Sequence, residues 1–183
     1  MPKDSEKLHD WLQIIGATAI VASLIFVGMQ LKQSQEIAIA GQYQARYESA
    51  AETARVYLQS DTGLKVWGTA IATGIRASGT FSDDFKAWAL EQPPEELGFR
   101  FWTAYIELKT HDNHLFQYQQ GFISEEAWQS FRKSFKQNLA APPDIYIQRQ
   151  VYLNDRQIWS APFQEYVNEL LEEIEADASR RTD

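Results

Sequence analysis

The sequence predicts an all-α protein in which a transmembrane helix near the N-terminus continues into a long helix that joins an irregular helical bundle. Three observations predict this fold. An uncharged apolar segment lies near the start, apolar residues then recur at intervals of three or four, and aromatic residues make up 13% of the 183 residues, enough for a packed core. We therefore divide the chain into an N-terminal tail (1–10), a transmembrane helix (11–31), a helical domain (32–178) and a frayed tail (179–183).

The transmembrane prediction rests on the 21 residues from Trp11 to Leu31, none of which is charged. A helix of this length is roughly 31 Å long, which matches a hydrocarbon core of about 30 Å. A cleaved signal peptide is one alternative, but its apolar region usually has about 7–15 residues. A buried helix of a soluble protein is the other alternative, and it rarely has so long an uncharged run. The membrane-spanning interpretation is therefore favoured.

The apolar segment also bears on neighbours and orientation. Gly16, Ala19 and Ser23 form a small face through which a second membrane helix can approach closely. A plain lipid-facing anchor is the alternative, which we favour slightly. Two lysines precede the segment and one closely follows it. Because positive charge tends to stay in the cytoplasm, this leans towards a cytoplasmic N-terminus and an exported domain.

The next helices are predicted from the positions at which the sequence stops favouring a helix. Residues 32–58 contain no proline and are rich in Ala, Gln, Glu and Arg, so the first helix is predicted to continue through them. A helix over 64–77 follows, with Asp61 or Thr62 as its cap. Ser82 and two aspartates then begin a helix over 82–91.

The second half of the chain contains the second long helix. Pro94 begins it, two glutamates fill its first turn, and Gly121 suits its C-terminal cap, which predicts a helix over 95–120. Ser124 caps a helix over 124–139. Residues 144–154 fit helix or strand by propensity, and we predict helix because no partner strand is visible. A last helix begins near Pro162 and has an acidic outer face.

Composition excludes several classes of chemistry. The net charge of −8 makes nucleic acid a poor partner, because an acidic surface repels phosphates. The chain has no cysteine, which removes disulfides, thiolate nucleophiles, zinc–thiolate sites and iron–sulfur clusters. No glycine-rich phosphate loop and no nucleophile elbow occur, so we predict no cofactor and lean against an enzyme.

Glu107, His111 and His114 are the weak metal-binding candidates. Glu107 and His111 are four residues apart and share one helix face, with His114 three residues further on. Glu107 and His111 are also the residues that an unrecognised enzyme would use. A carboxylate-bridged di-iron bundle needs paired Glu-x-x-His units, which the chain lacks. The favoured interpretation is therefore a solvated helix face.

Two groups of aromatic residues predict either a binding pocket or core packing. The first group surrounds Arg100 and the second lies near Gly121; together they comprise Phe99, Phe101, Trp102, Tyr105, Phe116, Tyr118 and Trp128. An arginine among aromatic rings can form a cation–π pocket. A core stripe with the arginine reaching to solvent is the favoured alternative.

Two stretches of sequence, WLQIIGATAIVASLIFVGMQLKQS and LFQYQQGFISEEAW, together resemble a group of uncharacterised bacterial inner-membrane proteins. Those proteins have one N-terminal span, a helical domain and a Y-x-x-G-x-x-x-x-x-x-W stretch, which Tyr118, Gly121 and Trp128 match here. The two stretches cover under a quarter of the chain. The resemblance implies a bacterial source and an inner-membrane location, and it implies no activity.

The leading functional hypothesis is a membrane-anchored helical interaction or scaffolding module. Its partners would be the lipid bilayer and either another protein or further copies of the same chain. A small-molecule sensor with an aromatic pocket is the second hypothesis, and an enzyme that uses Glu107 and His111 is the third.

Overall fold

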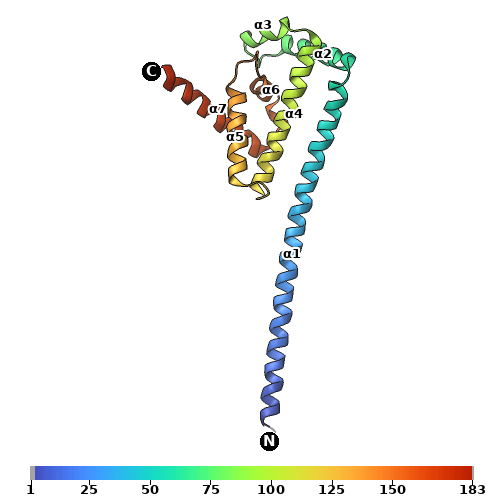
Figure 1. Cartoon of the computed structure of the whole chain (residues 1–183), viewed down its shortest axis with the longest axis vertical. Coiled ribbons are helices and arrows are strands. Elements are labelled where there is room, and N and C mark those ends of the chain that lie inside the picture. Colours follow the sequence, from blue (N-terminus) through green and yellow to red (C-terminus); the bar gives the residue numbers. More distant parts are fainter. Residues whose placement is uncertain (1–2, 183) are drawn as a thin grey trace. The chain divides into compact units, whose positions relative to one another are not determined.

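The computed structural model describes residues 3–182, with side chains described for residue 9 and residues 11–180. Its helices follow one another along the chain (Figure 1): α1 (Lys3–Leu58), α2 (Asp61–Ala77), α3 (Asp83–Glu91), α4 (Pro94–Gln119), α5 (Glu125–Ala140), α6 (Gln148–Asn154), the 3₁₀ helix η1 (Arg156–Ile158) and α7 (Ala161–Thr182). No strand occurs among the described residues. The all-α prediction is confirmed.

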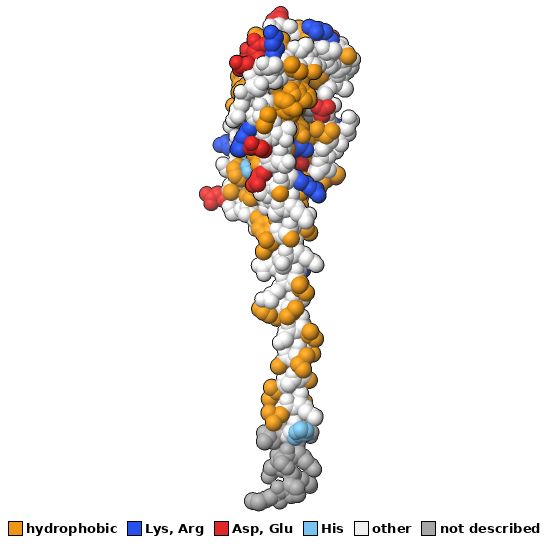
Figure 2. Space-filling view, turned by 90° about the vertical axis from the view of Figure 1, so that its right-hand side faces the viewer, with side chains coloured by type: hydrophobic (Ala, Val, Ile, Leu, Met, Phe, Trp, Pro, Cys, Tyr) orange, Lys and Arg blue, Asp and Glu red, His pale blue; other side chains and the backbone are white. Residues whose placement is uncertain are grey.

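The chain divides into two compact units, residues 1–42 and residues 43–183. The first unit is helical from Lys3 onward and confirms a long apolar N-terminal helix. Its most apolar 18-residue window has a mean hydropathy of 2.1 and no buried residue. Figure 2 shows hydrophobic side chains exposed along this unit. By length and composition the helix is able to cross a membrane.

Helix starts in the second unit follow side-chain capping. The hydroxyls of Ser82 and Ser124 accept hydrogen bonds from the backbone N–H groups of Phe85 and Ala127, as the sequence predicts. The cap of α2 is Ser60, whose hydroxyl accepts from Gly63 N at 3.0 Å. The sequence instead suggested Asp61 or Thr62, a difference of one or two residues that is common at helix ends.

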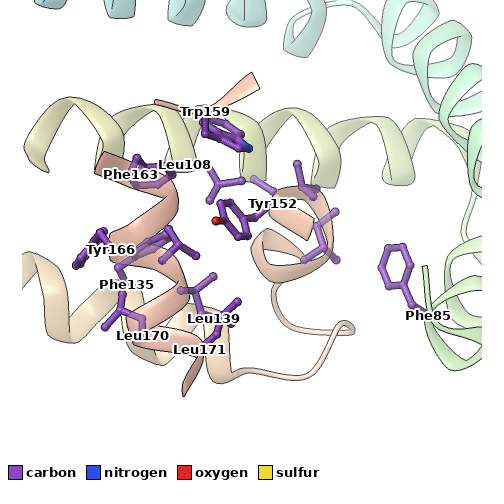
Figure 3. Close-up of a cluster of buried hydrophobic side chains, with 14 of the residues drawn as sticks. Phe85, Leu108, Phe135, Leu139, Tyr152, Trp159, Phe163, Tyr166, Leu170 and Leu171 are labelled. Atoms are coloured by element: carbon purple, nitrogen blue, oxygen red, sulfur yellow. The ribbon is translucent and has the colours of Figure 1, made fainter. Parts of the chain in front are cut away.

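The core of the second unit is built from aromatic and aliphatic side chains of α2–α7 (Figure 3). Tyr152 of α6 and Phe163 of α7 are fully buried and pack edge to face, with ring centroids 6.3 Å apart. Phe163 in turn stacks on Phe135 of α5, at a centroid distance of 6.0 Å. Each such ring removes a large apolar area from water, which is the main stabilising term for a domain of this kind.

Helices α2 and α4 pack with their backbones in close contact. A β-carbon added to Gly68 would lie 1.5 Å from the carbonyl oxygen of Pro94, and one added to Gly98 would lie 2.5 Å from that of Leu64. No side chain fits at either position. Two glycines on facing helices therefore set the distance between α2 and α4.

The segment before α6 differs in detail from the sequence-based expectation. Helix α6 covers only Gln148–Asn154 of the predicted 144–154 helix. The residues before it form a turn in which the carbonyl of Pro142 accepts from the N–H groups of Ile145 and Tyr146. The frayed tail, 179–183, stays a prediction: the backbone of α7 is described as far as Thr182, and Asp183 lies outside the described residues.

Candidate binding site

The three metal-binding candidates occupy one side of α4 and make packing contacts. Glu107 accepts a hydrogen bond from Gln148 of α6. The ring of His111 stacks on Phe135 at 4.0 Å, and that of His114 stacks on Phe131 at 4.2 Å. Within the described residues, no group of three or more metal-binding side chains comes together.

Burial keeps both histidines of α4 neutral over a wide pH range. Burial, with a contribution from His114, lowers the pKa of His111 to about 4. Burial also lowers the pKa of His114. Their Nδ1 atoms are buried and have no hydrogen-bond partner among the described residues. Two neutral rings stacked on phenylalanines act here as parts of the core.

The predicted aromatic residues separate into three places. Phe101, Trp102 and Tyr105 line one cavity, whereas Phe99 is exposed beside another. The remaining three are packed in pairs: Phe116 on Tyr43 at 4.1 Å, and Tyr118 on Trp128 at 4.8 Å.

The cavity lined by Phe101, Trp102 and Tyr105, which we call the aromatic cavity, has a volume of about 320 Å³. It lies among several helices of the second unit and is completed by Ala50 and Thr53 of α1, Trp67 and Ile71 of α2, Val151 of α6, and Asp155. Figure 2 shows hydrophobic side chains grouped over the second unit. A cavity of this size and lining is suited to a small apolar molecule.

The rings of the aromatic cavity differ in orientation. The planes of Trp67 and Trp102 are 81° apart with centroids separated by 5.4 Å, and those of Trp102 and Tyr105 are 89° apart at 5.8 Å. Burial, and then the negative charge of Asp155, raise the pKa of the Tyr105 hydroxyl. Asp155 lines the same cavity as Tyr105.

A second cavity of about 560 Å³, the polar cavity, shares Ala50 and Tyr105 with the first. Asp112 of α4 is its central polar residue. Asp112 Oδ1 accepts from the hydroxyl of Ser160 at 2.7 Å and from that of Tyr43 at 3.4 Å. Burial raises the pKa of Asp112, and the hydrogen bond from Ser160 opposes that rise.

Lys109 places a cation among the rings of the polar cavity. Its Nζ lies 4.4 Å from the ring centroid of Trp159 and 5.6 Å from that of Tyr105. Burial lowers the pKa of Lys109, and the carboxylate of Asp112 opposes this effect. Two ring faces therefore contact this ammonium group of α4, while its burial disfavours the positive charge.

Residues 43–58 of α1 contact α4 through rings and polar side chains. Tyr43 stacks on Phe116, and Tyr57 stacks on Trp102 at 5.2 Å with planes 10° apart. Between these two stacks the hydroxyls of Tyr47 and Thr110 are hydrogen-bonded at 3.1 Å. Such long side chains hold the helices apart, which leaves the two cavities between them.

Sequence reasoning missed Trp67, Asp155 and the tyrosines of α1 as neighbours of the predicted aromatic residues. The three tyrosines recur at positions 43, 47 and 57. This spacing is the signal that could have placed them on one face of α1. The small-face residues Gly16, Ala19 and Ser23 are exposed, and Gly16 has no atom within 4 Å of an added β-carbon.

Comparisons with protein-family models, with curated proteins and with solved structures give no significant match for this chain.

Proposed function

We propose that this protein is a single-pass membrane protein whose helical domain is a non-enzymatic binding module. The observation that supports the anchor is the exposed, uncharged segment from Trp11 to Leu31. In water so large an exposed apolar surface is strongly unfavourable, whereas in lipid it is the stable arrangement.

We assign the protein to a bacterial inner membrane, with a cytoplasmic N-terminus and an exported domain. The support is the resemblance of two sequence stretches and the excess of one lysine before the segment. A reporter enzyme that is active only outside the cytoplasm, fused after Asp183, is expected to be active. If a reporter that is active only in the cytoplasm is active at the same position instead, the orientation is the opposite one.

The aromatic cavity is the binding site that the geometry supports best. Its lining is mainly aromatic and aliphatic, with few polar groups, and it is formed by four helices of the second unit. Sites for small molecules usually have this character. We therefore assign the domain the capture of a small, largely apolar molecule.

A neutral fluorescent dye whose emission rises in apolar surroundings tests this assignment on the full chain in maltoside micelles. Ala50 lines both cavities, so Ala50→Phe fills them and is expected to lower dye binding by about tenfold. Val56→Phe is the matched control on the same helix, because Val56 is 62% exposed. Equal dye binding by the two variants would contradict the assignment.

A protein partner or a second copy of this chain is the second candidate occupant of the domain surface. The observation that favours it is a group of exposed apolar side chains beside a further cavity of about 330 Å³, namely Phe99, Ile145 and Tyr146. Chemical crosslinking in membranes should then give one stoichiometric product that Tyr146→Asp abolishes. Recovery of monomer alone would exclude it.

A further inference from the structure

We propose that the aromatic cavity binds a small soluble molecule bearing a quaternary ammonium group. This inference rests on the proposed function of the cavity and adds the chemical class of its ligand. The observations behind it are the partly buried carboxylate of Asp155 and the nearly perpendicular aromatic rings that line the same cavity.

Asp155 is the one charged residue among those that line the aromatic cavity in the described part of the chain. It is partly buried, and its carboxylate accepts one hydrogen bond, from Asn154 Nδ2 at 3.1 Å. Among the described residues it forms no ion pair. A neutral apolar ligand can fill the cavity but leaves this carboxylate without a counter-charge, whereas a ligand with an apolar surface that also carries a positive charge neutralises it.

The rings supply the second part of the site. Trp67 and Tyr105 are each almost perpendicular to Trp102. Rings in different planes can surround a rounded cation on several sides, and each ring face attracts positive charge through its quadrupole. Lys109 already occupies such a position on Tyr105 from the polar cavity, which it lines instead of the aromatic cavity.

The lining also selects among cations. A divalent metal ion needs about six oxygen ligands, and the cavity offers one carboxylate and the hydroxyls of Thr53 and Tyr105. A primary ammonium group would lose hydrogen bonds to water that aromatic walls cannot replace. A quaternary ammonium group has no N–H donor and is weakly hydrated, so this lining suits it.

The volume limits the size of the ligand. A cavity of about 320 Å³ is at the lower end of the range for small-molecule sites. It is large enough for a choline-sized group, and its one charged side chain is a carboxylate, which would repel the phosphate that a lipid headgroup carries next to choline. We therefore assign the site to a free solute.

Calorimetric titration of the full chain in maltoside micelles with choline, and separately with its neutral isostere 3,3-dimethylbutan-1-ol, tests the inference. Choline is expected to bind at least about tenfold more tightly than the isostere. Asp155→Asn should remove this preference, and Asp155→Glu should retain it. Trp67→Leu should weaken choline binding roughly fivefold, because it keeps an apolar side chain but removes the ring.

The matched control is Glu165→Gln, which removes the same charge from an exposed position of α7, a helix that contributes no residue to the cavity. It should bind choline as the unchanged protein does. Equal affinity for choline and its isostere, or an unaltered preference in Asp155→Asn, would overturn the inference.

The source of the ligand and the parent proposal are tested separately. Phosphatidylcholine vesicles and free phosphocholine are each tested as competitors of choline. If the vesicles compete as strongly as phosphocholine does, the ligand is a lipid headgroup and the assignment to a free solute is overturned. Suppose that Ala50→Phe abolishes dye binding but the unchanged protein binds choline no more tightly than its neutral isostere. The cationic ligand is then refuted, and the cavity remains a binding site. If the unchanged protein binds neither the dye nor choline, the cavity itself is refuted as a binding site.

Discussion

At the scale of single residues, Gly68 and Gly98 are the glycines at which a larger side chain is least tolerated. A methyl group on Gly68 would lie 1.5 Å from a backbone oxygen, and backbone atoms cannot move aside without separating α2 from α4. We expect Gly68→Ala and Gly98→Ala each to lower the free energy of unfolding by at least about 2 kcal/mol. Thermal and urea unfolding followed by circular dichroism would measure it.

Gly74 provides the matched control on the same helix. A β-carbon there would have no atom within 4 Å. Because alanine is the better helix former, Gly74→Ala should be neutral or stabilising, by up to about 1 kcal/mol. A loss of stability equal to that of Gly68→Ala would mean that general glycine effects, and not the contact between α2 and α4, explain the result.

The pKa of His111 predicts how stability depends on pH. The unfolded chain binds a proton at His111 below about pH 6.5, whereas the folded chain does so only near pH 4, because burial and His114 lower its pKa to about 4. Stability is therefore full above about pH 6.5 and falls as the pH decreases. We expect a loss on the order of 2 kcal/mol by pH 5 from this residue.

His111→Phe tests that prediction, since phenylalanine can keep the stack on Phe135. The free energy of unfolding of this variant should change less between pH 6.5 and pH 5 than that of the unchanged protein. His9→Phe is the control, because His9 is an exposed residue of the first unit. An unchanged pH dependence in His111→Phe would contradict a role for His111.

At the residue scale, the sequence indicated which aromatic residues could line a pocket. It did not indicate which residues of other helices lie beside them. Trp102 and Tyr105 were selected as possible pocket residues because they lie close together in the sequence, and they do line one cavity. Asp155 was not selected, since it is 50 residues further along the chain than Tyr105 and meets it only through the packing of α6 on α4. Long-range proximity of this kind leaves no local pattern.

At the scale of elements, residues 43–58 of α1 are held on α4 mainly by stacked rings. Tyr57 contacts both Trp102 and Trp67. We expect Tyr57→Ala to speed backbone hydrogen exchange in residues 50–58, corresponding to a loss of about 1–2 kcal/mol of local protection. Mass spectrometry after exchange into heavy water would resolve that peptide.

Arg55 offers the comparison for this element. Among the side chains that the structure describes, its guanidinium pairs only with the carboxylate of Glu52, at 3.2 Å, and both side chains are 68% exposed. Exposed pairs of this kind contribute little, so Arg55→Ala should leave exchange almost unaltered. Faster exchange in Arg55→Ala than in Tyr57→Ala would show that helix propensity, and not ring stacking, stabilises this part of α1.

The helices themselves were largely predictable from the sequence because their ends have local causes. Serine caps, Pro94 at the start of α4 and Gly121 at its end, with a φ of 77°, are all short-range signals. The turn before α6 was not predicted, because the choice between helix and turn over 144–147 depends on Pro142 and on packing against α4. The way two helices cross, as at the glycine contact of α2 with α4, depends on residues far apart in the sequence, so short-range signals do not predict it.

At the scale of the whole molecule, the account depends on residues 11–31 residing in lipid. The segment is uncharged and exposed over its whole described length, and the second unit has a separate core of its own. The fold class followed from these two features of the sequence. The ligand, by contrast, follows only from the arrangement of side chains around the aromatic cavity.

Membrane association of the full chain after alkaline carbonate extraction tests the central claim most directly. The unchanged protein should stay in the membrane pellet with an intact N-terminus. Val21→Arg with Leu24→Arg should release or destabilise it, since each arginine near the middle of a span costs about 2.5–3.5 kcal/mol. Ile37→Arg with Ile39→Arg, outside the span and equally exposed, should remain in the pellet. Recovery of the unchanged, unprocessed protein in the supernatant would contradict the account.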